Sequence, residues 1–276
     1  MNIPFWKMHG AANDFILMDD HQRTFPAQDT KWIAHIASRH TGVGSEGVIL
    51  IQPSDQADFR MRFFNPDGNE VEMCGNGARC AARLASEIGV ASDTMTIDTV
   101  AGTLRAHRLN DSIRLYLTDP KDWVLNQELE IEGVMLRYHS VNSGVPHVVI
   151  EVDDLVSTDV QRIGSATRHH EQFLPAGTNA NFIHCTGPNT LEIRTYERGV
   201  ESETLACGTG MAAAAMIAGK LGHITAPVQI IAASRDLLEV DYRLTDDGAT
   251  DVTLTGPAVH VFQGSLDYIH GGEGGI

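Results

Sequence analysis

Two short stretches place a cysteine directly before a glycine-rich turn. Residues 73–84 read MCGNGARCAARL and residues 205–216 read LACGTGMAAAAM, so Cys74 and Cys207 each precede Gly-x-Gly and a run of small residues that favour helix. A thiol at a helix N-terminus lies beside free backbone N–H groups and ionises more readily there. The glycines also let a small anion approach those N–H groups. Each stretch therefore predicts a reactive sulfur beside an anion site.

Two such sulfurs suit the inversion of a carbon atom that carries a hydrogen. One group removes the proton from one face, the other delivers a proton to the opposite face, and the two exchange roles in the reverse direction. Helix N-termini can stabilise the charge that develops on a neighbouring carboxylate. A single cysteine of this kind would favour a structural helix cap. Two cysteines in matching contexts favour catalysis instead.

The two stretches belong to a longer internal repeat. The interval from residue 74 to residue 207 is 133, close to half of the 276 residues. In both halves an alternating strand and a turn precede the cysteine, and a strand hairpin follows the helix. We therefore predict an α+β fold that is internally duplicated. Each of its two similar domains is expected to be a mostly antiparallel sheet or barrel around a central helix, with the active site in the cleft between them.

The apolar, alanine-rich composition of 78–88 and 211–220 predicts that these are the two central, buried helices. We place the first domain at 1–120 and the second at 121–263. The closing segment 264–276 is expected to return to the first domain as an edge strand, with a frayed tail at its end.

Composition excludes several functional classes. The net charge is −16, with 20 basic and 36 acidic residues, which argues against nucleic-acid or anionic-membrane partners. The N-terminus does not resemble a signal peptide, and no apolar run reaches transmembrane length, so we expect a cytoplasmic protein. The four cysteines lack zinc-site spacing, so no metal is expected. No segment reads as a Schiff-base lysine with a phosphate cup, so we expect no pyridoxal phosphate or other cofactor.

An ordered set of motifs resembles the diaminopimelate epimerase family. The set comprises HGAANDF (9–15), GVGSEG (42–47), FFNPDG (63–68), CGNGAR (74–79), PHVV (146–149), ANF (180–182), YERG (196–199), ACGTG (206–210) and TGPAVHVF (255–262). Each motif alone is weak, but together they run in order through nearly the whole chain. The resemblance implies interconversion of LL- and meso-diaminopimelate in lysine and peptidoglycan biosynthesis.

The resemblance also implies roles for individual residues. Cys74 and Cys207 match the two catalytic cysteines. The loops that hold the reacting carboxylate match Gly75, Asn76, Gly208 and Thr209. The residues that grip the distal amino acid end of the substrate match Asn13, Asn65, Asn181, Glu197 and Arg198. Charge agrees with the last set, because Arg198 can bind the distal carboxylate bidentately and Glu197 can bind the distal ammonium.

One stretch departs from the family pattern. Where many members read Gly-Asn-Pro-His, this chain reads NSGVPH, so Val145 stands in place of an asparagine that contacts the distal end. Asn142 could supply the amide instead. His147 could act as a proton shuttle or make a structural polar contact. Cys80 and Cys185 are expected to be inert packing residues.

Alternative functions remain at this stage. A cofactor-independent racemase of histidine, or of proline or hydroxyproline, would share the fold. Asn76 and Leu205-Ala206 depart from the CGHG and SPCGTG typical of proline racemases, and Arg198 argues against a histidine racemase without excluding it. A nucleotide-binding module lacks the third glycine and the βαβ context. A non-enzymatic thiol sensor would leave Asn65, Glu197 and Arg198 without a role. A homodimer is left open as the assembly state.

Overall fold

The computed structural model describes residues 1–269, and the tail predicted for residues 271–276 lies outside this range. The chain forms two compact units: unit 1 is Met1–Ile113 with the chain from Ala258 onward, and unit 2 is Arg114–Pro257. Sequence analysis placed the two crossings near 120 and 263. The structure has the first crossing inside strand β8 (Ser112–Tyr116) and the second between two strands, directly after Gly256-Pro257.

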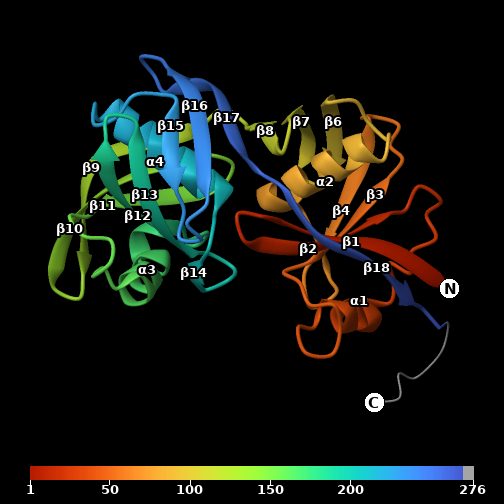
Figure 1. Cartoon of the computed structure of the whole chain (residues 1–276). Helices are drawn as coiled ribbons and strands as arrows, with labels where there is room; N and C mark the ends of the chain where they lie inside the picture. The colour runs from red at the N-terminus through yellow and green to blue at the C-terminus, as the bar shows by residue number, and fades with distance from the viewer. Residues whose placement is uncertain (270–276) are drawn as a thin grey trace. The chain divides into compact units, whose positions relative to one another are not determined.

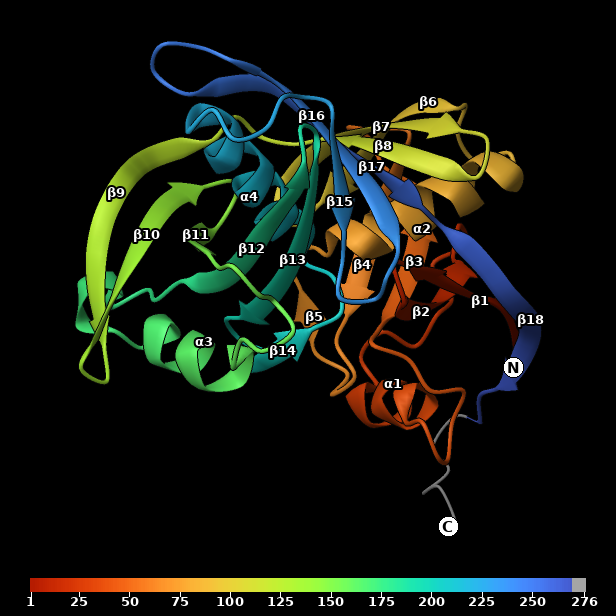
Figure 2. The same ribbon diagram turned by 60° about the vertical axis from the view of Figure 1, so that its left-hand side comes forward.

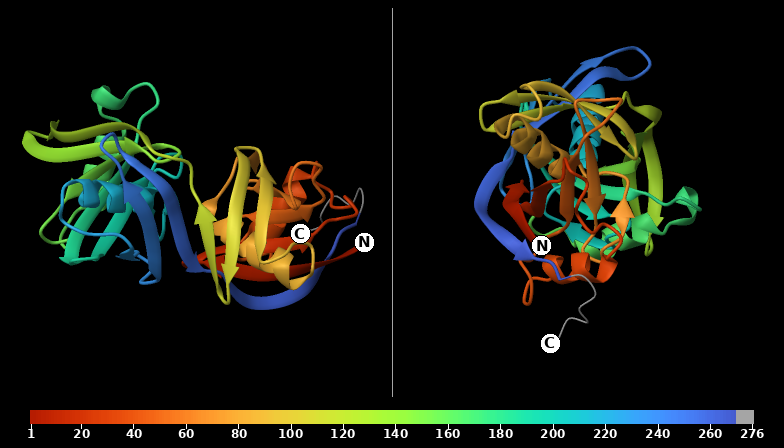
Figure 3. Two further views of the ribbon diagram at one scale, coloured as in Figure 1. Left: turned by 90° about the horizontal axis from the view of Figure 1, so that it is seen from above. Right: turned by 90° about the vertical axis from the view of Figure 1, so that its right-hand side faces the viewer.

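Unit 1 is built from short strands and two helices. They are β1 (Asn2–Gly10), β2 (Asn13–Asp19), α1 (Thr30–Ala37), β3 (Val48–Gln52), β4 (Phe59–Phe64), β5 (Glu70–Val71), α2 (Gly75–Glu87), β6 (Thr94–Thr99), β7 (Gly102–Leu109) and β18 (Val259–Asp267). The last strand pairs antiparallel with the first, from Asn2 opposite Asp267 to His9 opposite Val259. Figure 3 shows this blue strand running beside the red N-terminal strand.

Unit 2 repeats this construction. It contains β9 (Lys121–Ile131), β10 (Val134–Asn142), β11 (Pro146–Glu151), α3 (Val160–Arg168), the 3₁₀ turn η1 (Glu171–Phe173), β12 (Asn179–Gly187), β13 (Thr190–Glu197), β14 (Ser202–Thr204), α4 (Gly208–Lys220), β15 (Val228–Ile231), β16 (Leu237–Leu244) and β17 (Ala249–Pro257). The long antiparallel pair β9–β10 curves along one side of the unit (Figure 2).

Strand pairing confirms the internal duplication. In unit 1 the pair β1–β2 is antiparallel, β2–β3 parallel, β3–β4 and β4–β5 antiparallel, β4–β6 parallel and β6–β7 antiparallel. In unit 2 the pairs β10–β11, β11–β12, β12–β13, β13–β14, β13–β15 and β15–β16 follow with the same directions in the same order. Helices α2 and α4 therefore occupy equivalent places in the two units. Helix α2 follows the short strand β5, and α4 follows its counterpart β14.

Both central helices are buried, as their composition predicts. Every residue of α4 from Gly210 to Gly219 is buried, and α2 is buried from Asn76 to Ala82. Helix α4 contacts β10 to β13 and β15 to β17, while α2 contacts β1 to β4 and β7. Figure 1 shows each helix lying against the strands of its own unit. No helix within residues 1–269 is both long enough and apolar enough to cross a membrane.

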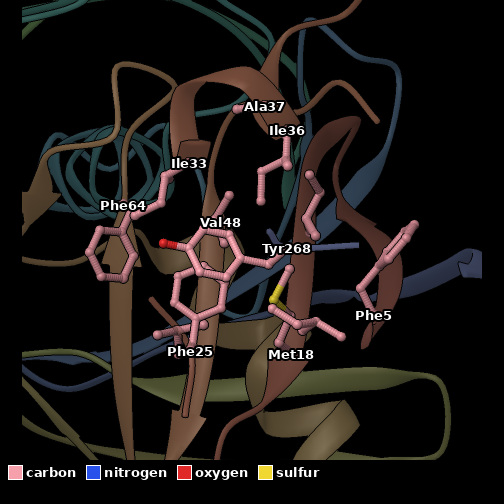
Figure 4. Close-up of a cluster of buried hydrophobic side chains, with 12 residues drawn as sticks. Phe5, Met18, Phe25, Ile33, Ile36, Ala37, Val48, Phe64 and Tyr268 are labelled. Carbon is pink, nitrogen blue, oxygen red and sulfur yellow. The ribbon is translucent and has the colours of Figure 1, made fainter. Parts of the chain in front are cut away.

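An apolar cluster of unit 1 packs against α1. It includes Ile33 and Ile36 of that helix, Val48 of β3, and Phe25 from the preceding loop. Tyr268 enters the same cluster with only 7% of its surface exposed (Figure 4). Its hydroxyl donates to the Asp29 carboxylate at 3.2 Å, and its backbone N–H donates to the Met1 carbonyl at 2.8 Å. These contacts fix the chain beyond β18 to unit 1.

Candidate active site

Cys74 and Cys207 are the N-cap residues of the two buried helices. Both have extended backbones, with φ and ψ of −134° and 121° at Cys74 and −120° and 107° at Cys207. Cys207 is 8% exposed, and Cys74 is more accessible. The helices begin at the next residue, three positions earlier than predicted, because the Gly-x-Gly segments already form the first helical turn. Each cysteine therefore stands at the positive end of a helix, where the first backbone N–H groups have no partner within the helix.

The second glycine of each turn permits a close approach between helix and sheet. A Cβ atom on Gly77 would lie 2.8 Å from Cδ1 of Ile49. A Cβ atom on Gly210 would lie 2.4 Å from Oδ1 of Asn181 and 3.3 Å from Sγ of Cys207. All three distances are shorter than ordinary van der Waals contact. The glycines are thus required for packing as well as for access to the N–H groups.

In unit 1, Asn13 reaches the sulfur of Cys74. This first residue of β2 follows a tight turn in which Ala11 and Ala12 have φ of 55° and 61°. Its Nδ2 lies 4.0 Å from Sγ of Cys74. Its Oδ1 is buried and has no hydrogen-bond partner among the described residues. A buried amide oxygen without a partner is costly, so a ligand N–H at this point would be favourable.

The N-terminal half of α2 also holds a buried charge. Arg79 is 0% exposed and donates from Nη2 to Oδ1 of Asn76 at 2.9 Å. Asn76, itself 3% exposed, thus has its side-chain oxygen engaged within the helix, and its backbone N–H is the group suited to an anion. Arg79 belongs to the CGNGAR motif, but the sequence alone predicts no role for it. Its sequence signal is an arginine among small buried residues, and its positive charge adds to that of the helix N-terminus.

Asn65 lies at the end of β4, where the chain turns back into β5. Its N–H donates to the Asn69 carbonyl and its carbonyl accepts from Gly68, both at 2.9 Å. Both backbone polar groups of Asn65 are thus hydrogen-bonded within the turn, and its side chain is half-buried.

In unit 2, four side chains form a connected series that ends at Cys207. Sγ of Cys207 lies 3.7 Å from Oγ1 of Thr209, which lies 2.9 Å from Nε2 of His147. Nδ1 of His147 lies 3.1 Å from Nδ2 of Asn181. Burial lowers the pKa of His147 from 6.5 to about 3, with the nearby positive charge of Arg198 acting in the same direction and the Asn181 hydrogen bond opposing both. The imidazole is therefore neutral at physiological pH.

Asn181 is fully buried, and both ends of its amide are used within unit 2. Nδ2 also donates to the Val148 carbonyl at 2.8 Å, and Oδ1 accepts from Oγ1 of Thr195 at 3.0 Å. His147 and Asn181 come from β11 and β12, which are parallel neighbours. Their proximity follows from a pairing that the sequence alone does not specify.

Glu197 and Arg198 lie together where β13 ends. Burial raises the pKa of Glu197, against the lowering effect of a hydrogen bond from Oγ1 of Thr204 at 3.0 Å. Arg198 is half-buried and donates from Nη1 to the Ala176 carbonyl at 3.0 Å. Its backbone N–H donates to Oδ1 of Asn179 at 2.8 Å. Sequence analysis did not identify Asn179, whose role in holding this turn depends on the pairing of β12 with β13.

The NSGVPH stretch, which departs from the family pattern, packs against the start of α4. Oδ1 of Asn142 accepts from the Gly144 N–H at 3.1 Å, which engages the oxygen of this amide in a local turn. Ser143 donates from Oγ to the Thr209 carbonyl at 2.8 Å. Val145 is half-buried in the same turn. The stretch thus fixes Thr209 from its backbone side, while His147 contacts its hydroxyl.

The other two cysteines have different surroundings. Cys80 is fully buried in α2, and burial raises its pKa to about 12. Cys185 in β12 is half-buried, and burial also raises its pKa. Both therefore resist ionisation. Within residues 1–269, no group of three or more His, Cys, Asp or Glu side chains is arranged to hold a metal ion.

Comparison with known proteins identifies the family. The model of the diaminopimelate epimerase family matches residues 5–124 and 139–261. The diaminopimelate epimerase of Aquifex aeolicus is 38% identical over 274 residues, covering 95% of this chain and 97% of that protein. The enzyme of the same name from Hydrogenobaculum is 41% identical over 275 residues, covering 95% and 98%.

Solved structures show the same fold at lower identity. A phenazine biosynthesis protein of the PhzF family from Bacillus anthracis has a TM-score of 0.74 at 17% identity, covering 97% of this chain and all of that chain. A probable proline racemase from Agrobacterium radiobacter has a TM-score of 0.70 at 15% identity, covering 96% and 93%. These two likenesses concern the fold alone. The full-length matches above show that this chain belongs to the diaminopimelate epimerase family.

Proposed function

We propose that this protein interconverts LL- and meso-diaminopimelate by a two-thiol mechanism that uses no pyridoxal phosphate. The observation that carries the proposal is the placement of Cys74 and Cys207 as N-caps of two equivalent buried helices, in a chain of this family. The deprotonated sulfur removes the α-proton from one face of the substrate. The protonated sulfur delivers a proton to the other face, and in the reverse direction their roles exchange.

The reacting carboxylate is held at the helix starts. Removal of the α-proton places negative charge on this group, and the N–H groups of Gly75, Asn76, Gly208 and Thr209 are the donors available to it. The buried charge of Arg79 strengthens the positive potential on the α2 side. Within each unit, Gly77 or Gly210 lets the first helical turn pack closely against its neighbouring strands.

The distal end of the substrate is bound by charge and by amides. Arg198 takes the distal carboxylate and Glu197 takes the distal ammonium. Binding the ammonium favours the ionised form of Glu197 and offsets the burial that raises its pKa. Asn13, whose buried Oδ1 has no partner among the described residues, and Asn65 supply amide contacts. Asn181 is better suited to support than to contact, because its own unit satisfies both ends of its amide.

The test is loss of the α-hydrogen in D2O, followed by NMR. Purified protein is incubated with diaminopimelate, histidine, proline and glutamate in separate reactions. We expect exchange and epimerisation with diaminopimelate and at least 100-fold slower exchange with the others. Histidine and proline lack both charged groups of the distal end, and glutamate lacks the distal ammonium, so none of them pairs with both Arg198 and Glu197. Faster exchange with histidine or proline would replace the proposal with a racemase of that amino acid. No exchange with any substrate would favour a thiol sensor.

We further propose that the protein acts in the cytoplasm, where a reducing environment keeps both thiols reduced. The net charge of −16 supports the absence of a nucleic-acid partner. Light scattering after size-exclusion chromatography decides between a monomer and a homodimer.

A further inference from the structure

We infer that Asn181 and His147 are positioning residues that orient the Thr209 hydroxyl as a hydrogen-bond donor to the sulfur of Cys207. The inference begins at the amide of Asn181. The Val148 carbonyl can only accept a hydrogen bond, and it lies 2.8 Å from one end of this amide, so that end is the NH2 group. The other end accepts from Thr195, in agreement with this orientation.

The orientation of the amide fixes the tautomer of His147. The second hydrogen on Nδ2 of Asn181 points to Nδ1 of the imidazole at 3.1 Å, so Nδ1 must be an acceptor. A neutral imidazole with an acceptor at Nδ1 carries its hydrogen on Nε2. Burial of the ring supports the neutral form, because a second proton on Nδ1 would face the NH2 group of Asn181.

The tautomer in turn fixes the direction of the Thr209 hydroxyl. Nε2–H of His147 donates to Oγ1 of Thr209 at 2.9 Å, so that oxygen is an acceptor for the imidazole. The hydroxyl hydrogen remains to be donated elsewhere, and Sγ of Cys207 lies 3.7 Å away. A donor in this position stabilises a thiolate more than a thiol. Ser143 restrains the same residue by donating to its carbonyl at 2.8 Å.

Unit 1 has a different arrangement at the equivalent place. The residue two positions after Cys74 is Asn76, and its side-chain oxygen accepts from Arg79. Nδ2 of Asn13, which belongs to the strand equivalent to that of His147, lies 4.0 Å from the sulfur of Cys74. The two cysteines thus occupy duplicated backbones, but an amide lies near the sulfur of Cys74 and a hydroxyl near that of Cys207.

The first experiment reads the tautomer directly. The protein is labelled with nitrogen-15 in its histidines, and the His147 signals are assigned by their loss in His147→Gln. We expect the Nε2–H tautomer at every pH from 5 to 8. An Nδ1–H tautomer, or protonation of this ring near pH 6, would overturn the inference.

The second experiment measures the reactivity of the Cys207 sulfur. Alkylation of Cys207 by iodoacetamide is followed by peptide mass spectrometry in a Cys74→Ala background, with buried Cys80 as the monitor of unfolding. Thr209→Val, which removes the hydroxyl, should slow alkylation at pH 7 about 3- to 10-fold and shift its pH profile to higher pH. Thr209→Ser, which keeps the hydroxyl, should stay within about twofold of the parent. Equal rates and profiles for valine and parent would overturn the inference.

A third variant tests the positioning residue itself. In Asn181→Asp the carboxylate would accept from Nδ1–H, leaving Nε2 as an acceptor that draws the Thr209 hydrogen away from the sulfur. We expect alkylation to slow as in Thr209→Val, although Thr209 is unchanged. A folded Asn181→Asp protein in which Cys207 is alkylated at the parent rate would contradict the proposed series of hydrogen bonds from Asn181 to Cys207. If this variant does not fold, the NMR experiment and the comparison of Thr209→Val with Thr209→Ser still test the inference.

The inference rests on the proposed function in one respect only, because that function explains why Cys207 must be reactive. Neither readout requires a substrate. A protein that shows the expected tautomer and alkylation rates but does not exchange diaminopimelate would reject the proposed function alone. A protein that epimerises diaminopimelate but fails either readout would reject this inference alone.

Discussion

Replacing Gly210 with alanine places a methyl group where the structure has no room. The new Cβ atom would lie 2.4 Å from Oδ1 of Asn181 and 3.3 Å from Sγ of Cys207. Asn181 cannot easily move away, because it is fully buried and hydrogen-bonded to His147, Val148 and Thr195. The helix start and β12 must therefore separate by several tenths of an ångström.

The cost follows from two opposing effects. Inserting a methyl group into a packed core typically costs about 1–3 kcal/mol. The alanine residue regains up to about 1 kcal/mol of helix propensity. We therefore expect Gly210→Ala to lower the free energy of unfolding by about 1–2 kcal/mol, or the melting temperature by roughly 2–8 °C. Because Cys207 is displaced with the helix start, kcat/KM should fall about tenfold or more.

Gly77→Ala is the matched control. Its Cβ atom would lie 2.8 Å from Cδ1 of Ile49, the end of a flexible side chain that can rotate. Differential scanning calorimetry and steady-state kinetics on both variants should show the larger losses for Gly210→Ala. If Gly210→Ala is as stable and as active as the parent, or if Gly77→Ala is the more damaging change, the packing argument is wrong.

The remaining predictions concern Arg198 and His147. If Arg198 binds the distal carboxylate as proposed, Arg198→Ala removes a charge-assisted contact worth about 2–5 kcal/mol. The kcat/KM for diaminopimelate should then fall roughly 30-fold to several thousand-fold, while the rate of Cys207 alkylation stays near normal. Unchanged kinetics would remove Arg198 from the proposed distal grip. His147 has a folded pKa of about 3 against 6.5 when unfolded. Between these values the unfolded chain binds a proton that the folded chain does not, so the free energy of unfolding falls as pH falls through this window. In urea denaturation, His147→Gln should show a shallower loss of stability from pH 7 to pH 4 than the parent, and an equal slope would contradict the burial of a neutral imidazole.

The fold was accessible from sequence because its main signals are local and occur twice. The Cys-Gly-x-Gly turns, the alanine-rich helices and the alternating strands each carry their own pattern, and repetition at an interval of 133 residues made the duplication visible. The domain boundaries were less accessible. The chain crosses inside β8, a regular strand without proline or glycine, whereas sequence analysis relied on the turn at Pro120.

Roles within the site depend on contacts that no local pattern encodes. Asn13, Asn65 and Asn181 look alike as asparagines beside strands, yet Asn181 is satisfied within its own unit and Asn13 has a buried oxygen without a partner among the described residues. Arg79 and Asn179 were missed for the same reason. A buried arginine in a helix and an asparagine that holds a turn acquire meaning only when strand pairing and burial are known.

The most direct test of the central claim follows the α-hydrogen of diaminopimelate by NMR in D2O with the parent, Cys74→Ala, Cys207→Ala and Cys80→Ala. Both LL- and meso-diaminopimelate are supplied, and circular dichroism confirms that each variant is folded. If Cys74 and Cys207 each serve one face of the carbon, either single replacement abolishes epimerisation and Cys80→Ala retains it. Full epimerisation by a folded Cys74→Ala or Cys207→Ala protein would contradict the two-thiol account.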